Sequence, residues 1–100
     1  MIPYGKQSIS DRDIEAVVKV LQSSHLTQGP VVPAFEKELA ALCSANHAVA
    51  VNSATSALHI ACLALEVGPG DTVWTSSTTF VASANCARYC GAAVDFVDID

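Results

Sequence analysis

The chain has 100 residues, of which 51% are hydrophobic and 15% are charged, and its formal net charge is -5. Ten acidic residues against five basic ones exclude the clustered basic face of a nucleic-acid-binding protein, and the lack of an export signal or membrane-spanning run predicts a cytoplasmic protein. The apolar fraction exceeds what one small domain readily covers, which indicates a subunit interface or a further part of the fold.

The first expected element is an amphipathic helix over residues 11–23. Ser10 followed by Asp13 resembles a capping box, with Asp in place of Glu. Apolar residues then recur at the i, i+3, i+4, i+7 spacing of one helix face: Ile14, Val17, Val18 and Leu21.

A loop and a second helix are expected next. The segment SSHLTQGP contains serines and a Gly-Pro pair without apolar periodicity, which is typical of a loop. Pro33 suits the beginning of a helix, and the apolar stripe after it predicts a helix that ends near Asn46. The stripe consists of Phe35, Leu39 and Leu42.

Strands and helices alternate in the second half of the chain. GPGD and Gly91 punctuate the two turns from helix to strand. This order predicts an α/β fold with a mostly parallel sheet. The expected elements are a strand over 47–51, a helix over 54–66, a strand over 71–76, a helix over 80–90 and a strand over 93–99.

The helix over 54–66 is apolar nearly all round, so we expect it to be buried. His59 within it is interpreted as a hydrogen-bonded core histidine, and Trp74 in the following strand as a packing residue.

A polar cluster lies where this helix begins: Asn52, Ser53, Thr55 and Ser56. One of these side chains suffices to cap a helix, and surplus hydroxyls in an apolar setting are costly unless they have partners. The alternative is an anion site, in which hydroxyl and backbone donors converge on a phosphate. Neither GxGxxG nor GxxxxGK[ST] is present, so a single terminal phosphate suits the turn better than a dinucleotide or nucleoside triphosphate.

Four cysteines lie among small apolar residues, without CxxC spacing: Cys43, Cys62, Cys86 and Cys90. Cys86 and Cys90 are four apart and could form half of a metal site, but no second ligand pair accompanies them. We therefore interpret the cysteines as small buried hydrophobes and expect no metal site.

The segments NSATSALHIACLALEVGPGD and TTFVASANCARYCGAAVDFVDID, with HLTQGP upstream, resemble the DegT/DnrJ/EryC1/StrS family over nearly the whole chain. The resemblance implies the N-terminal part of the large domain of a type I (aspartate aminotransferase-like) transferase that depends on pyridoxal 5'-phosphate (PLP). Within the family, LTQG and NSATSALH look most like the aminotransferase of pseudaminic acid biosynthesis. That enzyme acts on C4 of a UDP-linked 4-keto-6-deoxy-N-acetylhexosamine with L-glutamate as amino donor.

The resemblance also implies positions for the cofactor. It places the cofactor phosphate on Ala54, through its backbone, and on Thr55 and Ser56, and it places the pyridine ring on Phe80. A position in the core is the alternative interpretation of Phe80.

The nucleotide sugar has its own implied positions. They are Tyr4, Ser24, His25, Leu26, Thr27 and Ala54. His25 departs from the family's pattern at its position. Tyr4 could instead anchor the chain end, and Thr27 could be an ordinary loop hydroxyl.

The catalytic groups that the resemblance implies are a lysine that binds the cofactor aldehyde and a carboxylate that faces the pyridine nitrogen. The three lysines, Lys6, Lys19 and Lys37, lie outside the family's lysine motif. None of the three aspartates in or after the last expected strand matches the carboxylate that faces the ring nitrogen: Asp95, Asp98 and Asp100. We therefore expect no catalytic residue in this chain and interpret it as the N-terminal fragment of a homodimeric enzyme.

Two domain segments are expected. Residues 1–46 form an N-terminal helical segment with the substrate loop, and residues 47–100 begin the PLP-binding α/β large domain. Two other functions stay open: a PLP-dependent 4-keto-sugar dehydratase of the same family, or a non-catalytic α/β phosphate-binding module.

Overall fold

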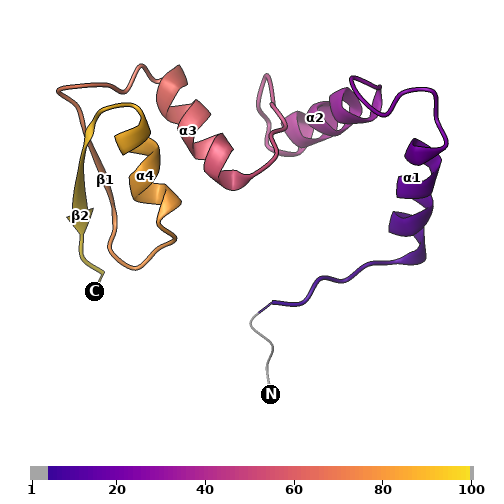
Figure 1. Ribbon diagram of the computed structural model, residues 1–100, viewed down its shortest axis with the longest axis horizontal. Helices are drawn as coiled ribbons and strands as arrows, with labels where there is room; N and C mark the ends of the chain where they lie inside the picture. The colour runs from indigo at the N-terminus through magenta and orange to yellow at the C-terminus, as the bar shows by residue number, and fades with distance from the viewer. Residues whose placement is uncertain (1–4, 100) are drawn as a thin grey trace. The chain divides into compact units, whose positions relative to one another are not determined.

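The structure is a computed structural model that describes residues 5–99. The chain divides into two compact units, Met1–Ala50 and Val51–Asp100. The domain boundary expected after residue 46 stays a prediction. None of the helices within residues 5–99 is both long enough and apolar enough to cross a membrane. The elements are α1 (Asp11–Leu21) and α2 (Val31–Leu42) in the first unit, and α3 (Ala54–Ala64), β1 (Thr72–Ser76), α4 (Ala82–Tyr89) and β2 (Ala93–Val97) in the second (Figure 1).

The predicted capping box at the start of α1 is confirmed. The Ser10 hydroxyl accepts a hydrogen bond from the Asp13 backbone N–H at 3.3 Å, and the Asp13 carboxylate accepts from the Ser10 backbone N–H at 2.7 Å. The hydrogen bond from the Ser10 backbone N–H is the main cause of the lowered pKa of Asp13, and the bond that the Ser10 hydroxyl donates to the same carboxylate lowers this pKa further.

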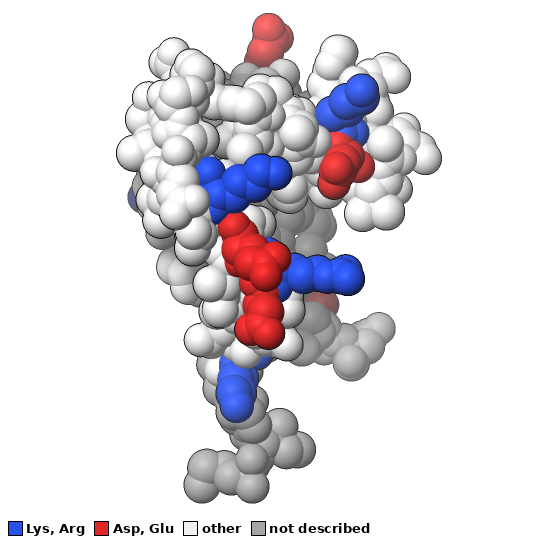
Figure 2. Space-filling model, turned by 90° about the vertical axis from the view of Figure 1, so that its right-hand side faces the viewer, with Lys and Arg blue, Asp and Glu red and all other residues white. Residues whose placement is uncertain are grey.

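Acidic and basic side chains are interspersed on the face that Figure 2 shows.

Helix α2 differs from the prediction at both ends. It begins at Val31, so Pro33 lies within the first turn, where a missing N–H costs no hydrogen bond. It ends at Leu42 because Ser44 adopts a positive φ of 52° and the Ala45 N–H then bonds back to the Ala40 carbonyl.

The strand predicted over residues 47–51 is absent, and that prediction is wrong for this structure. The one sheet within residues 5–99 consists of β1 and β2, so this segment has no neighbouring strand with which to pair. The Ala50 backbone N–H instead donates to the Glu36 carboxylate at 2.8 Å.

The second unit contains the expected parallel pair. β1 pairs with β2 in the register Thr72↔Ala93 through Ser76↔Val97. α4 connects the two strands and packs against both of them and against α3. Gly91 ends α4 with a φ of 82°, and the Ala92 N–H bonds to the Ala87 carbonyl.

The core of the second unit follows one face of α4. The buried hydrophobic residues within residues 5–99 are Ala82, Cys86, Ala87 and Ala92. The expectation of a buried α3 is wrong: none of its residues is buried, and Leu63 is 54% exposed. The reason is that α4 is the only element within residues 51–99 that packs closely on α3.

Loss of the Ser10 hydroxyl should change the titration of Asp13 only in part. In Ser10→Ala the backbone N–H of residue 10 remains, so we expect the pKa of Asp13 to rise part of the way to its ordinary value. The NMR titration of the Asp13 carboxyl carbon measures this, with Ser8→Ala as the matched control. Folding lowers the pKa of Asp13, so the ionised carboxylate stabilises the folded chain at pH values above the ordinary pKa. This stabilisation is lost as the pH falls through the lowered pKa. An unchanged titration in Ser10→Ala would contradict the capping box.

Candidate functional site

Three of the four polar side chains at the beginning of α3 bind one another. Ser53 is the N-cap, and its hydroxyl accepts from the Ser56 backbone N–H at 3.2 Å. The Ser53 and Ser56 hydroxyls lie 3.0 Å apart, and the Ser56 hydroxyl donates to the Asn52 side-chain oxygen at 2.8 Å. Helix capping therefore accounts for more of this cluster than the single residue expected from the sequence.

Three hydrogen-bond donors remain at the start of α3. Within residues 5–99 the backbone N–H groups of Ala54 and Thr55 and the Thr55 hydroxyl have no hydrogen-bond partner. Ala54 and Thr55 are the first two residues of the helix, where the helix dipole places a partial positive charge. This arrangement can bind one anionic group.

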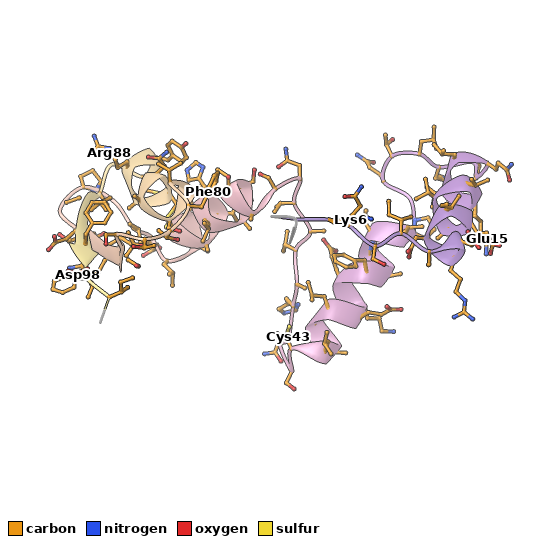
Figure 3. All side chains as sticks on the ribbon, turned by 90° about the horizontal axis from the view of Figure 1, so that it is seen from below. Lys6, Glu15, Cys43, Phe80, Arg88 and Asp98 are labelled. Atoms are coloured by element: carbon orange, nitrogen blue, oxygen red, sulfur yellow. The ribbon has the colours of Figure 1, made fainter. Side chains whose placement is uncertain are left out.

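Phe80 lies between β1 and α4 in the second unit. α4 begins at Ala82, two residues after Phe80, and the Phe80 carbonyl accepts from the Ser83 N–H at 3.0 Å. The Phe80 side chain is 72% exposed, so the core interpretation does not hold in this unit. The Phe80 side chain is drawn and labelled in Figure 3. In Figure 1, β1 and β2 run toward the side of the second unit on which α4 begins. This is the carboxyl side of the strands, where open α/β sheets bind ligands.

The predicted substrate loop borders a cavity in the first unit. The volume of this cavity is about 440 Å³, and Ser24 and His25 line it whereas Leu26 and Thr27 do not. The His25 Nδ1 atom lies 2.9 Å from the Ser24 hydroxyl. Tyr4, the remaining substrate residue of this half, lies outside the described residues.

Lys19 and Ser23 also line this cavity, and neither was predicted from the sequence. Their spacing of four places them on one side of the C-terminal end of α1, so a projection of that helix beyond Leu21 would have identified them. Ser23 fixes the loop: its hydroxyl donates to the His25 carbonyl at 3.1 Å and accepts from the His25 N–H at 3.3 Å. The cavity thus combines an apolar wall with a lysine, a histidine and two serines.

Three of the four cysteines belong to the contact between α3 and α4. Burial is the main cause of the raised pKa of the Cys62 thiol, and the neighbouring thiols of Cys86 and Cys90 raise this pKa further. Cys86 is buried and its thiol donates to the Ser83 carbonyl at 3.3 Å. No group of three or more potential metal ligands occurs within the described part of the chain.

The sequence predicts a hydrogen-bonded core histidine at position 59 and a packing residue at Trp74. His59 is half-buried and does not lie in the core of this unit. The His59 ring lies 5.2 Å from the Tyr89 ring, between centroids, so His59 contributes to the packing of α3 on α4. Trp74 is 66% exposed, and its interpretation as a packing residue is wrong within this unit.

Known proteins resemble this chain over nearly all of its length. The sequence model of the DegT/DnrJ/EryC1/StrS aminotransferase family matches residues 7–100. The spore coat polysaccharide biosynthesis protein SpsC of Bacillus subtilis is 48% identical over 99 residues, which are 99% of this chain and 25% of SpsC. The UDP-4-amino-4-deoxy-L-arabinose–oxoglutarate aminotransferase of Shewanella sediminis is 39% identical over 99 residues, which are 99% of this chain and 26% of that protein.

A solved structure agrees with these relatives. Spr1654 of Streptococcus pneumoniae, described as a sugar aminotransferase and solved in its PLP form, has a TM-score of 0.91 and 36% identity, and the match covers 99% of this chain and 25% of that one. This likeness confirms the predicted fold class, the N-terminal part of a type I PLP-dependent transferase large domain. The chain spans about a quarter of the length of these relatives.

Removal of the Ser53 hydroxyl should loosen the first turn of α3. In Ser53→Ala the Ser56 N–H loses its acceptor, which costs about 1 kcal/mol, and we expect its amide hydrogen to exchange about fivefold faster. Hydrogen-exchange mass spectrometry or NMR measures this rate, with Ser77→Ala as the control. Equal exchange rates in wild type and Ser53→Ala would refute the capping role.

Proposed function

Because the chain belongs to the DegT/DnrJ/EryC1/StrS aminotransferase family, we propose that it is the part of a PLP-dependent sugar aminotransferase that binds the cofactor phosphate. The relatives named as aminotransferases and the PLP form of Spr1654 support this assignment. The complete enzyme is proposed to act as a cytoplasmic homodimer, in which the catalytic lysine lies outside residues 1–100.

The donor group at the start of α3 is the observation that carries this proposal. A phosphate ester accepts several hydrogen bonds, and the N–H groups of Ala54 and Thr55 together with the Thr55 hydroxyl offer three donors beside a helix dipole. The residues therefore fit the phosphate of PLP. Ser56 stays a proposed phosphate contact. Its hydroxyl and N–H bind Asn52 and Ser53, so it also shapes the turn that presents the donors.

Phe80 is proposed to support the pyridine ring. Its exposed side chain lies on the carboxyl side of the strands, where a planar ring can stack on it and be shielded from water. When PLP is bound, its ring would supply an electron sink for the carbon that carries the amino group. In this account the chain's own residues anchor the phosphate and orient the ring, and other residues move the proton.

The proposed substrate is a UDP-linked 4-keto-6-deoxy-N-acetylhexosamine, which receives an amino group at C4 from L-glutamate. The name of the Shewanella relative supports a UDP-linked sugar, a 4-amino product and an oxoglutarate co-product. The cavity beside Ser24 and His25 is proposed to receive part of the nucleotide sugar, and Lys19 provides a positive charge for its diphosphate. Tyr4, Leu26, Thr27 and the backbone of Ala54 stay proposed substrate contacts.

Replacement of Thr55 tests the phosphate site. In the full-length protein that contains this chain, Thr55→Val should weaken PLP binding about tenfold, because one hydrogen bond to a charged phosphate is lost. Titration of the apoenzyme with PLP, followed through the visible absorbance of the bound cofactor, measures the Kd. Thr72→Val is the control, because Thr72 is the first residue of β1 and lies at the end of the strand away from Phe80. This variant should bind PLP as the wild type does.

Two results would contradict the proposal. If the wild-type protein takes up no PLP, the assignment to a PLP enzyme fails. If Thr55→Val and Thr72→Val bind PLP equally well, the phosphate lies elsewhere. Mass spectrometry of the sugar product separates the reactions, because amino transfer replaces the keto oxygen by an amine whereas the dehydratase alternative removes water.

A further inference from the structure

Gly29 lies unusually close to His25 in the loop that borders the cavity of the first unit. A Cβ atom at position 29 would lie 3.0 Å from the His25 carbonyl oxygen and 3.1 Å from the His25 Cβ. The best contacts between non-bonded carbon atoms lie at about 3.5–4.0 Å, so a side chain at position 29 would displace His25. Gly29 has no positive φ, so the close approach, and not the backbone conformation, requires a glycine here.

The Ser23 hydroxyl holds the backbone of the same histidine. It donates to the His25 carbonyl at 3.1 Å and accepts from the His25 N–H at 3.3 Å. The carbonyl that Ser23 binds is also the group that Gly29 approaches. Gln28, with a φ of 54°, turns the chain immediately before Gly29. The backbone of His25 is therefore held by residues that precede it and by residues that follow it in the sequence.

His25 borders the cavity that is proposed to receive part of the nucleotide sugar. Its ring Nδ1 lies 2.9 Å from the Ser24 hydroxyl, and both residues line the cavity together with Lys19. Because Nδ1 is bound to Ser24, Nε2 is the ring nitrogen that can bind a ligand. Hydrogen bonds weaken steeply as their geometry departs from the optimum, so a displaced His25 backbone would weaken a bond from this ring.

We propose that Gly29 and Ser23 are positioning residues for His25 in the nucleotide-sugar cavity. The missing side chain at position 29 and the hydroxyl at position 23 keep the His25 backbone in place, so that Nε2 is available to the diphosphate. This inference rests on the proposed function, because it presupposes that a nucleotide sugar binds in this cavity. Gly29 itself touches no ligand in this account.

Binding of UDP to the full-length protein that contains this chain tests the proposal, with isothermal titration calorimetry as the measurement. Gly29→Ala introduces the Cβ that displaces His25, and we expect it to weaken UDP binding about tenfold. Gly68→Ala is the matched control, because a Cβ at position 68 would meet its nearest neighbour at 3.9 Å, which is an ordinary contact. The control should leave the Kd of UDP unchanged.

Ser23→Ala tests the second contact with His25. It removes both hydrogen bonds of the Ser23 hydroxyl and adds no atom to the loop, and we expect UDP binding to weaken about fivefold. Ser8→Ala, which changes an exposed serine ahead of α1, is its control. If Gly29→Ala does not fold, Ser23→Ala carries the same test.

A double-mutant cycle with His25→Ala separates positioning from a general change in the loop. His25→Ala removes the ring and should itself weaken UDP binding about tenfold. In this background Gly29→Ala and Ser23→Ala should have no further effect, because both act through the ring. A role in loop structure alone would weaken UDP binding to the same extent with and without the ring.

Distinct results overturn the inference and the function on which it rests. Wild-type binding of UDP by both Gly29→Ala and Ser23→Ala overturns the positioning role, and so does wild-type binding by His25→Ala. Equal effects of Gly29→Ala in the presence and absence of the His25 ring also overturn it. Failure of the wild type itself to bind UDP rejects the nucleotide-sugar substrate of the proposed function, and this inference with it.

Discussion

Burial of one face of α4 holds residues 51–99 together. This face consists of small side chains, among them Ala82, Cys86 and Ala87, which let α4 lie close to both strands. A parallel pair needs such a crossover, because its strands cannot be joined by a tight turn. The crossover brings the carboxyl ends of β1 and β2 to one side of the unit, and Phe80 lies on that side. The proposed ring position therefore depends on the packing of α4.

The polar groups at the beginning of α3 have two roles. Asn52, Ser53 and Ser56 bond to one another and fix the first turn, whereas Thr55 and two backbone N–H groups stay available for a ligand. These bonds account for the hydroxyls of Ser53 and Ser56, and the proposal assigns the remaining hydroxyl, that of Thr55, to the phosphate.

Local signals explain which features could be predicted from the sequence. The capping box of Ser10 and the turn at Gly91 depend on residues a few positions apart, and both are confirmed. The strand over 47–51, the burial of α3 and the packing of Trp74 require partners that residues 5–99 do not supply, and these predictions are wrong for this structure. The contact between Glu36 and Ala50 spans 14 positions without a periodic pattern, so no local rule could reveal it.

The central claim is that the first turn of α3 binds the phosphate of PLP. A crystal structure of the full-length protein with PLP tests this claim most directly. The account predicts phosphate oxygens within about 3 Å of the Thr55 hydroxyl oxygen and of the Ala54 and Thr55 backbone nitrogens. A phosphate bound elsewhere, with these three donors directed to protein groups or to solvent, would contradict it.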